Sequence, residues 1–335
     1  MKIIDYIRSA AAADKRSAMP VLSFPGVQKM NVTVRELTAD SNLQANAMKV
    51  VADSTPDSLA SVSFMDLSVE AEAFGACVRF SDDEVPTITG QLVSDEDEAN
   101  ALEVPEVGAA RTGICVEGIR LAKEKITGRP VFAGCIGPYS LAGRLMDVTE
   151  IMYLCFDEPE TVEIVLNKAT EFLINYINAF KAAGADGIVI AEPLAGLLSP
   201  AMNEEFSIPY MEKIIKAVQT DDFAVIYHNC GNSVNRQLDE IFGLNAAAYH
   251  FGNAISMTEV FEKAPEDAVC MGNIDPAGQF AGGTPESIYE DTMNLLKALE
   301  GKKNFIISSG CDIPPHAKWE NIDSFFKAVA DYNAK

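Results

Sequence analysis

Short apolar runs recur along the chain and alternate with longer segments in which apolar residues follow a helical spacing. A strand that is buried on both faces has such a nearly continuous apolar pattern, as in a parallel sheet covered by helices. The sequence predicts eight strands of this kind. They are residues 21–24, 59–64, 131–136, 187–190, 223–227, 246–249, 268–271 and 304–307.

The segments between these runs predict helices. Residues 159–183 place apolar side chains such as Ile177 and Phe180 at helical spacing, and residues 203–219 and 285–299 repeat the pattern. Eight strands that alternate with helices favour a closed (β/α)8 barrel, the TIM-barrel class of α/β fold.

We expect one barrel domain over residues 1–335. Residues 75–128 interrupt the alternation and predict an irregular insertion with a small hairpin and acidic loops. Residues 1–8 predict the start of an amphipathic helix and do not have the pattern of a signal peptide.

Charge and cysteine content narrow the range of partners. The 49 acidic and 26 basic residues give a net charge of −23, which argues against binding to nucleic acid or to an anionic membrane surface. No apolar run approaches the roughly 20 residues that cross a bilayer. The seven cysteines are scattered and odd in number, which fits reduced thiols and a cytoplasmic location.

Chemically active residues gather where the predicted strands end. His228 and Cys230 close one strand two residues apart, so their side chains leave the same face, and Cys311 closes the last strand. Because the active sites of such barrels lie at the carboxyl ends of the strands, these three residues are candidate ligands of a catalytic zinc ion. The alternative is that the cysteines are ordinary buried packing residues.

Four further strand-end residues have a functional and a structural interpretation. Glu192 is a candidate catalytic residue, as a displaceable fourth zinc ligand or a partner of a ligand, or else a helix-capping carboxylate. Asn273 and Asp275 are candidate cofactor-binding residues, but both types also form turns before proline. His250 is a candidate hydrogen-bond donor to the site, or a packing residue.

Several segments together resemble the uroporphyrinogen decarboxylase superfamily, and in particular its methylcobamide:coenzyme M methyltransferase branch. They are residues 64–75, 228–232, 272–276, 283–286 and 309–315. The resemblance implies a (β/α)8 barrel that binds zinc through His228, Cys230 and Cys311. It also implies transfer of a methyl group from a methylcobamide (corrinoid) to a zinc-bound thiol.

The sequence lacks the Asp-x-His-x-x-Gly pattern of corrinoid-binding domains, so we expect the corrinoid to arrive on a carrier protein. The methyl acceptor stays open between coenzyme M, another thiol and a folate. A sulfonate such as that of coenzyme M needs a cation, and the candidates are Lys29, Arg35, Arg144 and Lys318.

Two other functions compete with methyl transfer. A uroporphyrinogen decarboxylase holds a substrate with eight carboxylates through an arginine-rich N-terminal segment, and the corresponding residues 22–29 contain no arginine. A noncatalytic module that binds zinc or a corrinoid protein is the third possibility, and it would have a closed site with four protein ligands.

Overall fold

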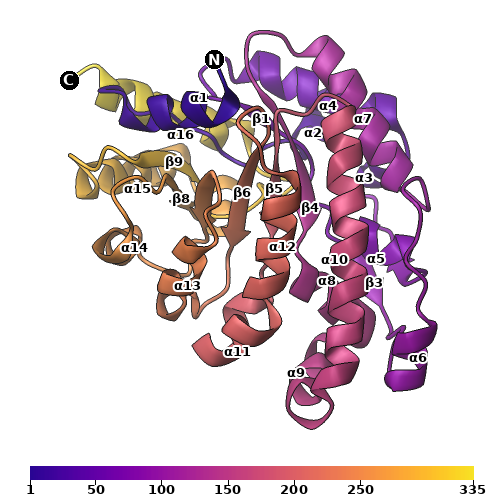
Figure 1. The fold of residues 1–335 in the computed structure, drawn as a ribbon. Coiled ribbons are helices and arrows are strands. Elements are labelled where there is room, and N and C mark those ends of the chain that lie inside the picture. The colour runs from indigo at the N-terminus through magenta and orange to yellow at the C-terminus, as the bar shows by residue number, and fades with distance from the viewer.

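Seven parallel strands form one curled sheet in the computed structural model, which describes all residues 1–335 (Figure 1). The order across the sheet is β1-β4-β5-β6-β7-β8-β9, so each strand lies beside the next one in sequence. The strands are β1 (Ser61–Val62), β4 (Val131–Ile136), β5 (Gly187–Ala191), β6 (Ala224–Asn229), β7 (Ala248–Phe251), β8 (Cys270–Ile274) and β9 (Phe305–Ser309).

A short extended segment around Ala18 closes the sheet. Ala18 forms parallel bridges both to Ser58, just before β1, and to Ile307 in β9. The amide of Met19 donates to the carbonyl of Ile307 at 2.9 Å, and the amide of Leu59 donates to the carbonyl of Ala18 at 2.8 Å. The predicted α/β barrel is therefore confirmed.

The predicted first strand at residues 21–24 is wrong in position, because the closing bridges form at Ala18. Pro20 has no amide proton for a sheet ladder, and the amide of Val21 donates to the side-chain oxygen of Ser309 at 3.0 Å. The chain then turns at Pro25 into the short helix α2 (Gly26–Met30). The apolar run at residues 21–24 thus marks a buried turn.

Side chains of each strand alternate between two apolar cores. The inward positions, for example Val189 and Ile226, form the core inside the barrel, whereas Ile190 and Val225 face the surrounding helices. Helix α1 (Ile3–Ala12) packs its buried face against the inward core. It lies at the end of the barrel opposite α9 (Val148–Asp157) and α11 (Pro200–Phe206), so α1 does not cover the carboxyl ends of the strands (Figure 1).

The outer layer contains the predicted helices at 159–183 and 285–299, observed as α10 (Pro159–Ala182) and α15 (Pro285–Ala298). The predicted helix at 203–219 is broken at Ser207 into two, because Pro209 lies in the first turn of the new helix and offers no amide proton. Outside residues 75–128, the remaining helices are α3 (Val34–Thr38), α4 (Ser41–Ser54), α5 (Val69–Ala73), α8 (Pro138–Met146), α9 (Val148–Asp157), α11 (Pro200–Phe206), α12 (Ile208–Val218), α13 (Leu238–Gly243), α14 (Met257–Lys263) and α16 (Trp319–Asn333). Short helical turns are η1 (Ala195–Leu197), η2 (Val234–Arg236) and η3 (Pro276–Ala281).

The segment expected to be an irregular insertion contains regular structure. Its hairpin pairs β2 (Cys77–Arg79) with β3 (Thr87–Thr89), and helix α6 (Glu96–Ala101) follows. Helix α7 (Thr112–Lys125) then packs on α4 and covers the sheet. The expectation of irregular structure is wrong for α7. Charged residues on its outer face separate its apolar residues, so its helical pattern is weak in the sequence. No helix of the chain is both long and apolar enough to cross a membrane.

Candidate metal centre

Three side chains that the sequence singled out meet at the carboxyl end of the barrel. His228 continues the inward-facing series of β6 after Ala224 and Ile226, and Cys230 follows two residues later. Cys311 lies two residues beyond the end of β9. One ligand atom from each of the three residues lies within 4.8 Å of the other two.

The imidazole of His228 has one nitrogen without a partner. The residue is 2% exposed, and its Nε2 atom is buried and makes no hydrogen bond. Its Nδ1 atom lies 3.2 Å from the carbonyl oxygen of His250. A buried nitrogen without a partner is costly, and a metal ion in contact with Nε2 would remove that cost.

The two thiols interact with one another. The hydrogen bond from Cys311 lowers the pKa of Cys230, whereas the same bond, with burial, raises the pKa of Cys311. A bound cation such as zinc would hold both sulfurs as thiolates. One imidazole and two thiolates fit a catalytic zinc site with three protein ligands.

Two glycines allow the loops after β7 and β9 to pass close to their neighbours around the three clustered residues. A Cβ atom added at Gly252, just after β7, would lie 2.6 Å from the Cβ atom of Cys230. One added at Gly310 would lie 2.7 Å from the amide of Asn253. Sequence reasoning did not identify these two glycines, although a glycine directly after a barrel strand was the available signal.

The carboxylate of Glu192 is not part of the cluster of three ligand atoms, although the backbone amide of Glu192 donates to the carbonyl of His228 at 2.8 Å. It is fully buried after β5, where its Oε2 accepts from the amide of Tyr139 at 3.0 Å and its Oε1 from the amide of Ser140 at 2.6 Å. Both donors are in the first turn of α8, so the carboxylate caps this helix, and a catalytic role of Glu192 stays a prediction. Burial raises the pKa of Glu192 to about 7.

Asn273 and Asp275 are occupied by contacts within the protein. The side-chain amide of Asn273 donates to the carbonyls of Gly252 and Ile255, at 2.9 and 2.8 Å. Asp275 caps η3 by accepting from two backbone amides. These are the turn-forming roles of the two residues, and a role in cofactor binding stays a prediction.

With this geometry established, comparison with known proteins places the chain in a family. The profile of the uroporphyrinogen decarboxylase (URO-D) family matches residues 15–332. The chain belongs to the uroporphyrinogen decarboxylase family. It is 27% identical over 276 residues to the methylcobamide:CoM methyltransferase MtbA of Methanosarcina acetivorans, covering 80% of this chain and 78% of that protein. It is 26% identical over 284 residues to the uroporphyrinogen decarboxylase of Hahella chejuensis, covering 82% and 79%.

The family fold extends over the whole chain. A methyltransferase from Methanosarcina mazei superimposes with a TM-score of 0.88 at 23% identity and covers 99% of both chains. A B12-independent methionine synthase from Shewanella gives a TM-score of 0.61 at 13% identity and covers 97% of both. At these identities the two structures establish the α/β barrel fold.

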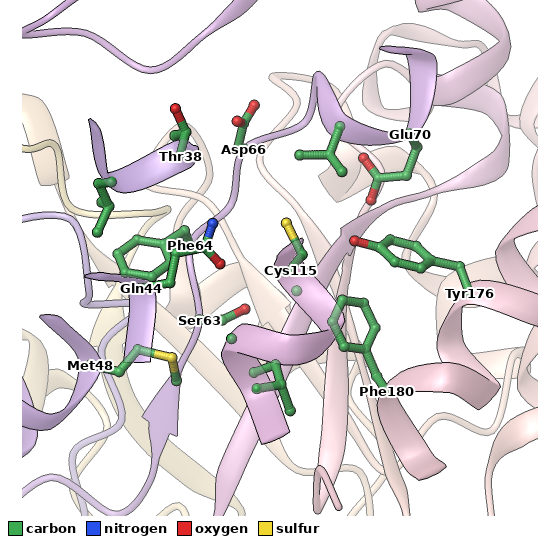
Figure 2. Close-up of a pocket in the computed structure, with 15 residues that line it drawn as sticks. Thr38, Gln44, Met48, Ser63, Phe64, Asp66, Glu70, Cys115, Tyr176 and Phe180 are labelled. Atoms are coloured by element: carbon green, nitrogen blue, oxygen red, sulfur yellow. The ribbon is translucent and has the colours of Figure 1, made fainter. Parts of the chain in front are cut away.

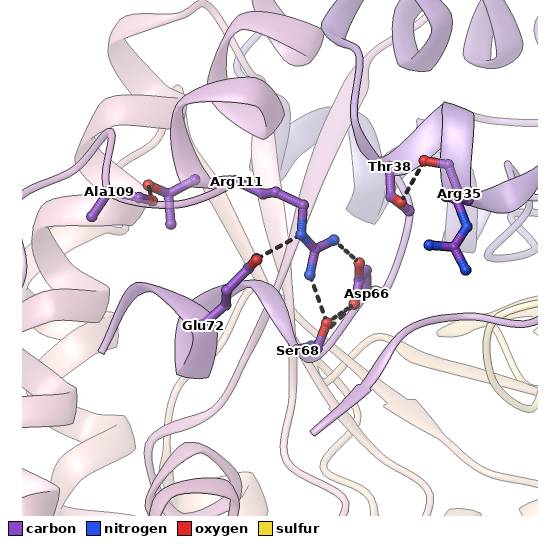
Figure 3. A network of polar contacts seen from close by, with 8 residues as sticks. Arg35, Thr38, Asp66, Ser68, Glu72, Ala109 and Arg111 are labelled. Atoms are coloured by element: carbon purple, nitrogen blue, oxygen red, sulfur yellow. Dashed lines mark hydrogen bonds and ion pairs between the residues drawn. The ribbon is translucent and has the colours of Figure 1, made fainter. Parts of the chain in front are cut away.

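The segment 64–75, which resembled the family, forms a buried polar network beside the barrel. Arg111 pairs with Asp66, donates to Glu72 at 2.6 Å and donates to Ser68 at 2.8 Å (Figure 3). Because Arg111 is the N-cap residue directly before helix α7, this network ties that helix to the turn after β1. Sequence reasoning did not identify Arg111, whose partners lie some 40 residues earlier in the chain.

Glu70 from the same segment faces a small cavity. It is 1% exposed, its Oε1 accepts from the amide of Ile136 at 3.2 Å, and its Oε2 has no partner. Burial raises the pKa of Glu70 to about 8. Figure 2 shows Glu70 beside Tyr176 and Cys115 in this cavity. The free volume of about 20 Å³ admits a water molecule but no substrate.

Proposed function

We propose that this protein is a zinc-dependent methyltransferase, which moves a methyl group from a corrinoid on a carrier protein to an acceptor thiol. The observation that carries the proposal is the cluster of His228, Cys230 and Cys311, whose ligand atoms lie within 4.8 Å of one another at the mouth of the barrel. The similarity to proteins named methylcobamide:CoM methyltransferases supports the same reaction.

The chain's own residues would hold the metal ion and shape its charge. Nε2 of His228 and the sulfurs of Cys230 and Cys311 would provide the three protein ligands, and the acceptor thiol would take an open position. Bound zinc supplies a lowered thiol pKa, so that the acceptor is a thiolate at neutral pH. The two cysteine thiolates keep that sulfur electron-rich, because they offset the charge of the ion.

The transfer itself is a displacement at carbon. The acceptor thiol gives its proton to solvent on binding, and its sulfur then donates an electron pair to the methyl carbon. A carbon–sulfur bond forms while the cobalt–carbon bond breaks, and the electron pair of the broken bond stays on the corrinoid of the carrier protein. No further oxidant or reductant is required.

Of the cations considered for an anionic acceptor, Arg144 is the first to test. Arg35 already pairs with Asp82 at 2.8 Å, and the ammonium of Lys29 lies 3.9 Å from the ring centre of Trp319. The ammonium of Lys318 donates to the carbonyl of Gly283 at 3.1 Å. The Nε atom of Arg144 is buried without a partner, and burial lowers the pKa of this residue. A sulfonate would satisfy this guanidinium.

Decarboxylation is the alternative that the other relatives support, since several of them are named uroporphyrinogen decarboxylases. It gives no role to a cluster of one histidine and two cysteines. The absence of arginine from residues 22–29 also disfavours a substrate with eight carboxylates.

The test combines metal analysis with a methyl-transfer assay. We expect nearly one zinc ion per chain, and loss of the methyl group from free methylcobalamin when coenzyme M or another thiol is added, followed by absorbance. Protein purified without chelator that contains no zinc and supports no thiol-dependent demethylation would refute the proposal. Turnover of uroporphyrinogen by such a preparation would establish decarboxylation instead.

A further inference from the structure

We infer that His250 and Ser308 are positioning residues, which fix the protons of His228 so that its Nε2 atom carries a free lone pair toward the two cysteines. This inference rests on the metal centre proposed above. It assigns a donor and an acceptor to each hydrogen bond in a relay of three buried side chains behind the site, those of His228, His250 and Ser308.

The three side chains of this relay lie inside the barrel. Like His228, His250 in β7 and Ser308 in β9 occupy positions that alternate with outward-facing neighbours such as Tyr249 and Ile307. His250 is 2% exposed and Ser308 is fully buried. Water therefore does not compete for their hydrogen bonds.

Three contacts of equal length join the side chains of the relay to one another and to the backbone. Nδ1 of His250 lies 2.7 Å from Nδ1 of His228, and Nε2 of His250 lies 2.7 Å from Oγ of Ser308. Oγ of Ser308 lies 2.7 Å from the carbonyl oxygen of Met19, in the segment that closes the barrel.

The last contact sets the direction of all the others. The carbonyl of Met19 can only accept, so the hydroxyl of Ser308 donates its single proton there. Ser308 has then used its only proton, so it must accept from Nε2 of His250, which carries the ring proton. Nδ1 of His250 is consequently an acceptor, and Nδ1 of His228 is the donor.

A separate contact leads to the same assignment. Nδ1 of His228 also lies 3.2 Å from the carbonyl oxygen of His250, which again can only accept. With its proton on Nδ1, the neutral ring of His228 has its lone pair on Nε2. That is the buried atom without a hydrogen-bond partner. Ligating histidines are commonly held in one tautomer through the other ring nitrogen.

Two nearly isosteric substitutions test the role of His250. His250→Asn keeps an acceptor close to the position of Nδ1, whereas His250→Leu fills similar space without one. We expect the zinc dissociation constant, measured by competition with a chromogenic chelator, to rise about 10- to 100-fold in His250→Leu. In His250→Asn it should stay within about threefold of wild type, because the acceptor is retained.

Ser308→Ala tests the relay itself. In the wild-type background this substitution removes the group that selects the tautomer of His250, and we expect zinc binding to weaken about tenfold. In the His250→Asn background it should have no further effect, because an asparagine oxygen needs no such selection. This comparison also serves if His250→Leu fails to fold, which circular dichroism would show.

The cobalt(II)-substituted proteins provide a second readout. We expect His250→Leu to change the visible d–d bands that report the imidazole ligand, and His250→Asn to preserve them. Equal zinc affinity in wild type, His250→Leu and Ser308→Ala would overturn the inference, as would an equal effect of Ser308→Ala in both backgrounds. If the wild-type protein itself binds no zinc, it is the proposed function that fails.

Discussion

At the scale of single residues, the candidate zinc ligand Cys311 has a matched control within the chain. Replacing Cys311 by Ala should remove most of the bound zinc and the thiol-dependent methyl transfer, because two protein ligands hold a zinc ion weakly. Cys77→Ala, at an exposed position of the β2–β3 hairpin, should leave both unchanged. Elemental analysis and the methylcobalamin assay measure the two effects. Full zinc content in Cys311→Ala would remove this residue from the ligand set.

Glu70 gives a second residue-scale prediction, which concerns pH and stability. Its folded pKa of about 8 lies above the unfolded value near 4.5, so the folded protein holds a proton that the unfolded chain releases between these values. The contribution of this group to stability is therefore full below about pH 4.5 and falls as the pH rises toward 8. The fall is on the order of a few kcal/mol.

Glu70→Gln should abolish this fall, because an amide does not titrate. We expect the stability of the variant, relative to wild type, to increase between pH 5 and pH 8 in urea unfolding experiments. Glu290→Gln, at an exposed position of α15, is the control and should show no such trend. A stability difference that stays constant with pH would contradict the assignment of Glu70.

The expectation that functional residues lie at the carboxyl ends of barrel strands located some candidate site residues, but it could not assign every role. His228 and Cys230 share one strand, and their two-residue spacing alone places them on one face. For Glu192 the sequence left capping and metal binding open. The answer depends on where the first turn of α8 lies, more than 50 residues earlier in the chain, and local pattern carries no such information.

At the scale of elements, Glu192 should matter to α8 and not to metal content. Glu192→Gln replaces one accepting oxygen by an amide that faces a backbone N–H, so one buried donor loses its partner. We expect a loss of about 1–3 kcal/mol in the free energy of unfolding at pH 8, with zinc content unchanged. Glu262→Gln, exposed on α14, is the control. Loss of zinc together with unchanged stability would show that the carboxylate binds the metal.

Apolar runs predicted the elements that have a strong local pattern of apolar residues. The strands from β4 to β9 and the helices α10 and α15 have strong local patterns, and the structure confirms them. Errors arose where proline altered the backbone. Pro209 lies in the first turn of a new helix inside one continuous amphipathic pattern, and Pro20 and Pro25 turn an apolar run into a buried turn.

At the scale of the whole molecule, closure of the barrel has almost no local signal. Ala18 joins the two edges of the sheet through one bridge to Ser58 and one to Ile307, which lie 40 and 289 residues later in the sequence. The same closing segment provides the carbonyl of Met19 that ends the hydrogen-bond chain behind His228. Hydrogen bonds of Ser308 therefore link the closing segment to His250, which lies behind the candidate metal centre.

Arg16, two residues before the closing bridge, anchors this segment and allows the coupling to be tested. Its guanidinium donates to the carbonyls of Leu299 and Lys302 at 2.7 and 2.5 Å, at the end of α15. Arg16→Ala removes both bonds. We expect a loss of about 1–3 kcal/mol in stability. Faster hydrogen exchange should appear at the amides of Met19 and Leu59, which pair across the closure.

Exchange in β5 and β6 should change less than at the closure, because those strands keep both neighbours in the sheet. Arg8→Ala, at an exposed position of α1, is the matched control and should alter neither exchange nor stability. If the closing segment also orders Ser308, Arg16→Ala should weaken zinc binding without any change near the ligands themselves. Uniformly faster exchange over the whole sheet would show that Arg16 supports global stability alone and that closure is not a separate unit.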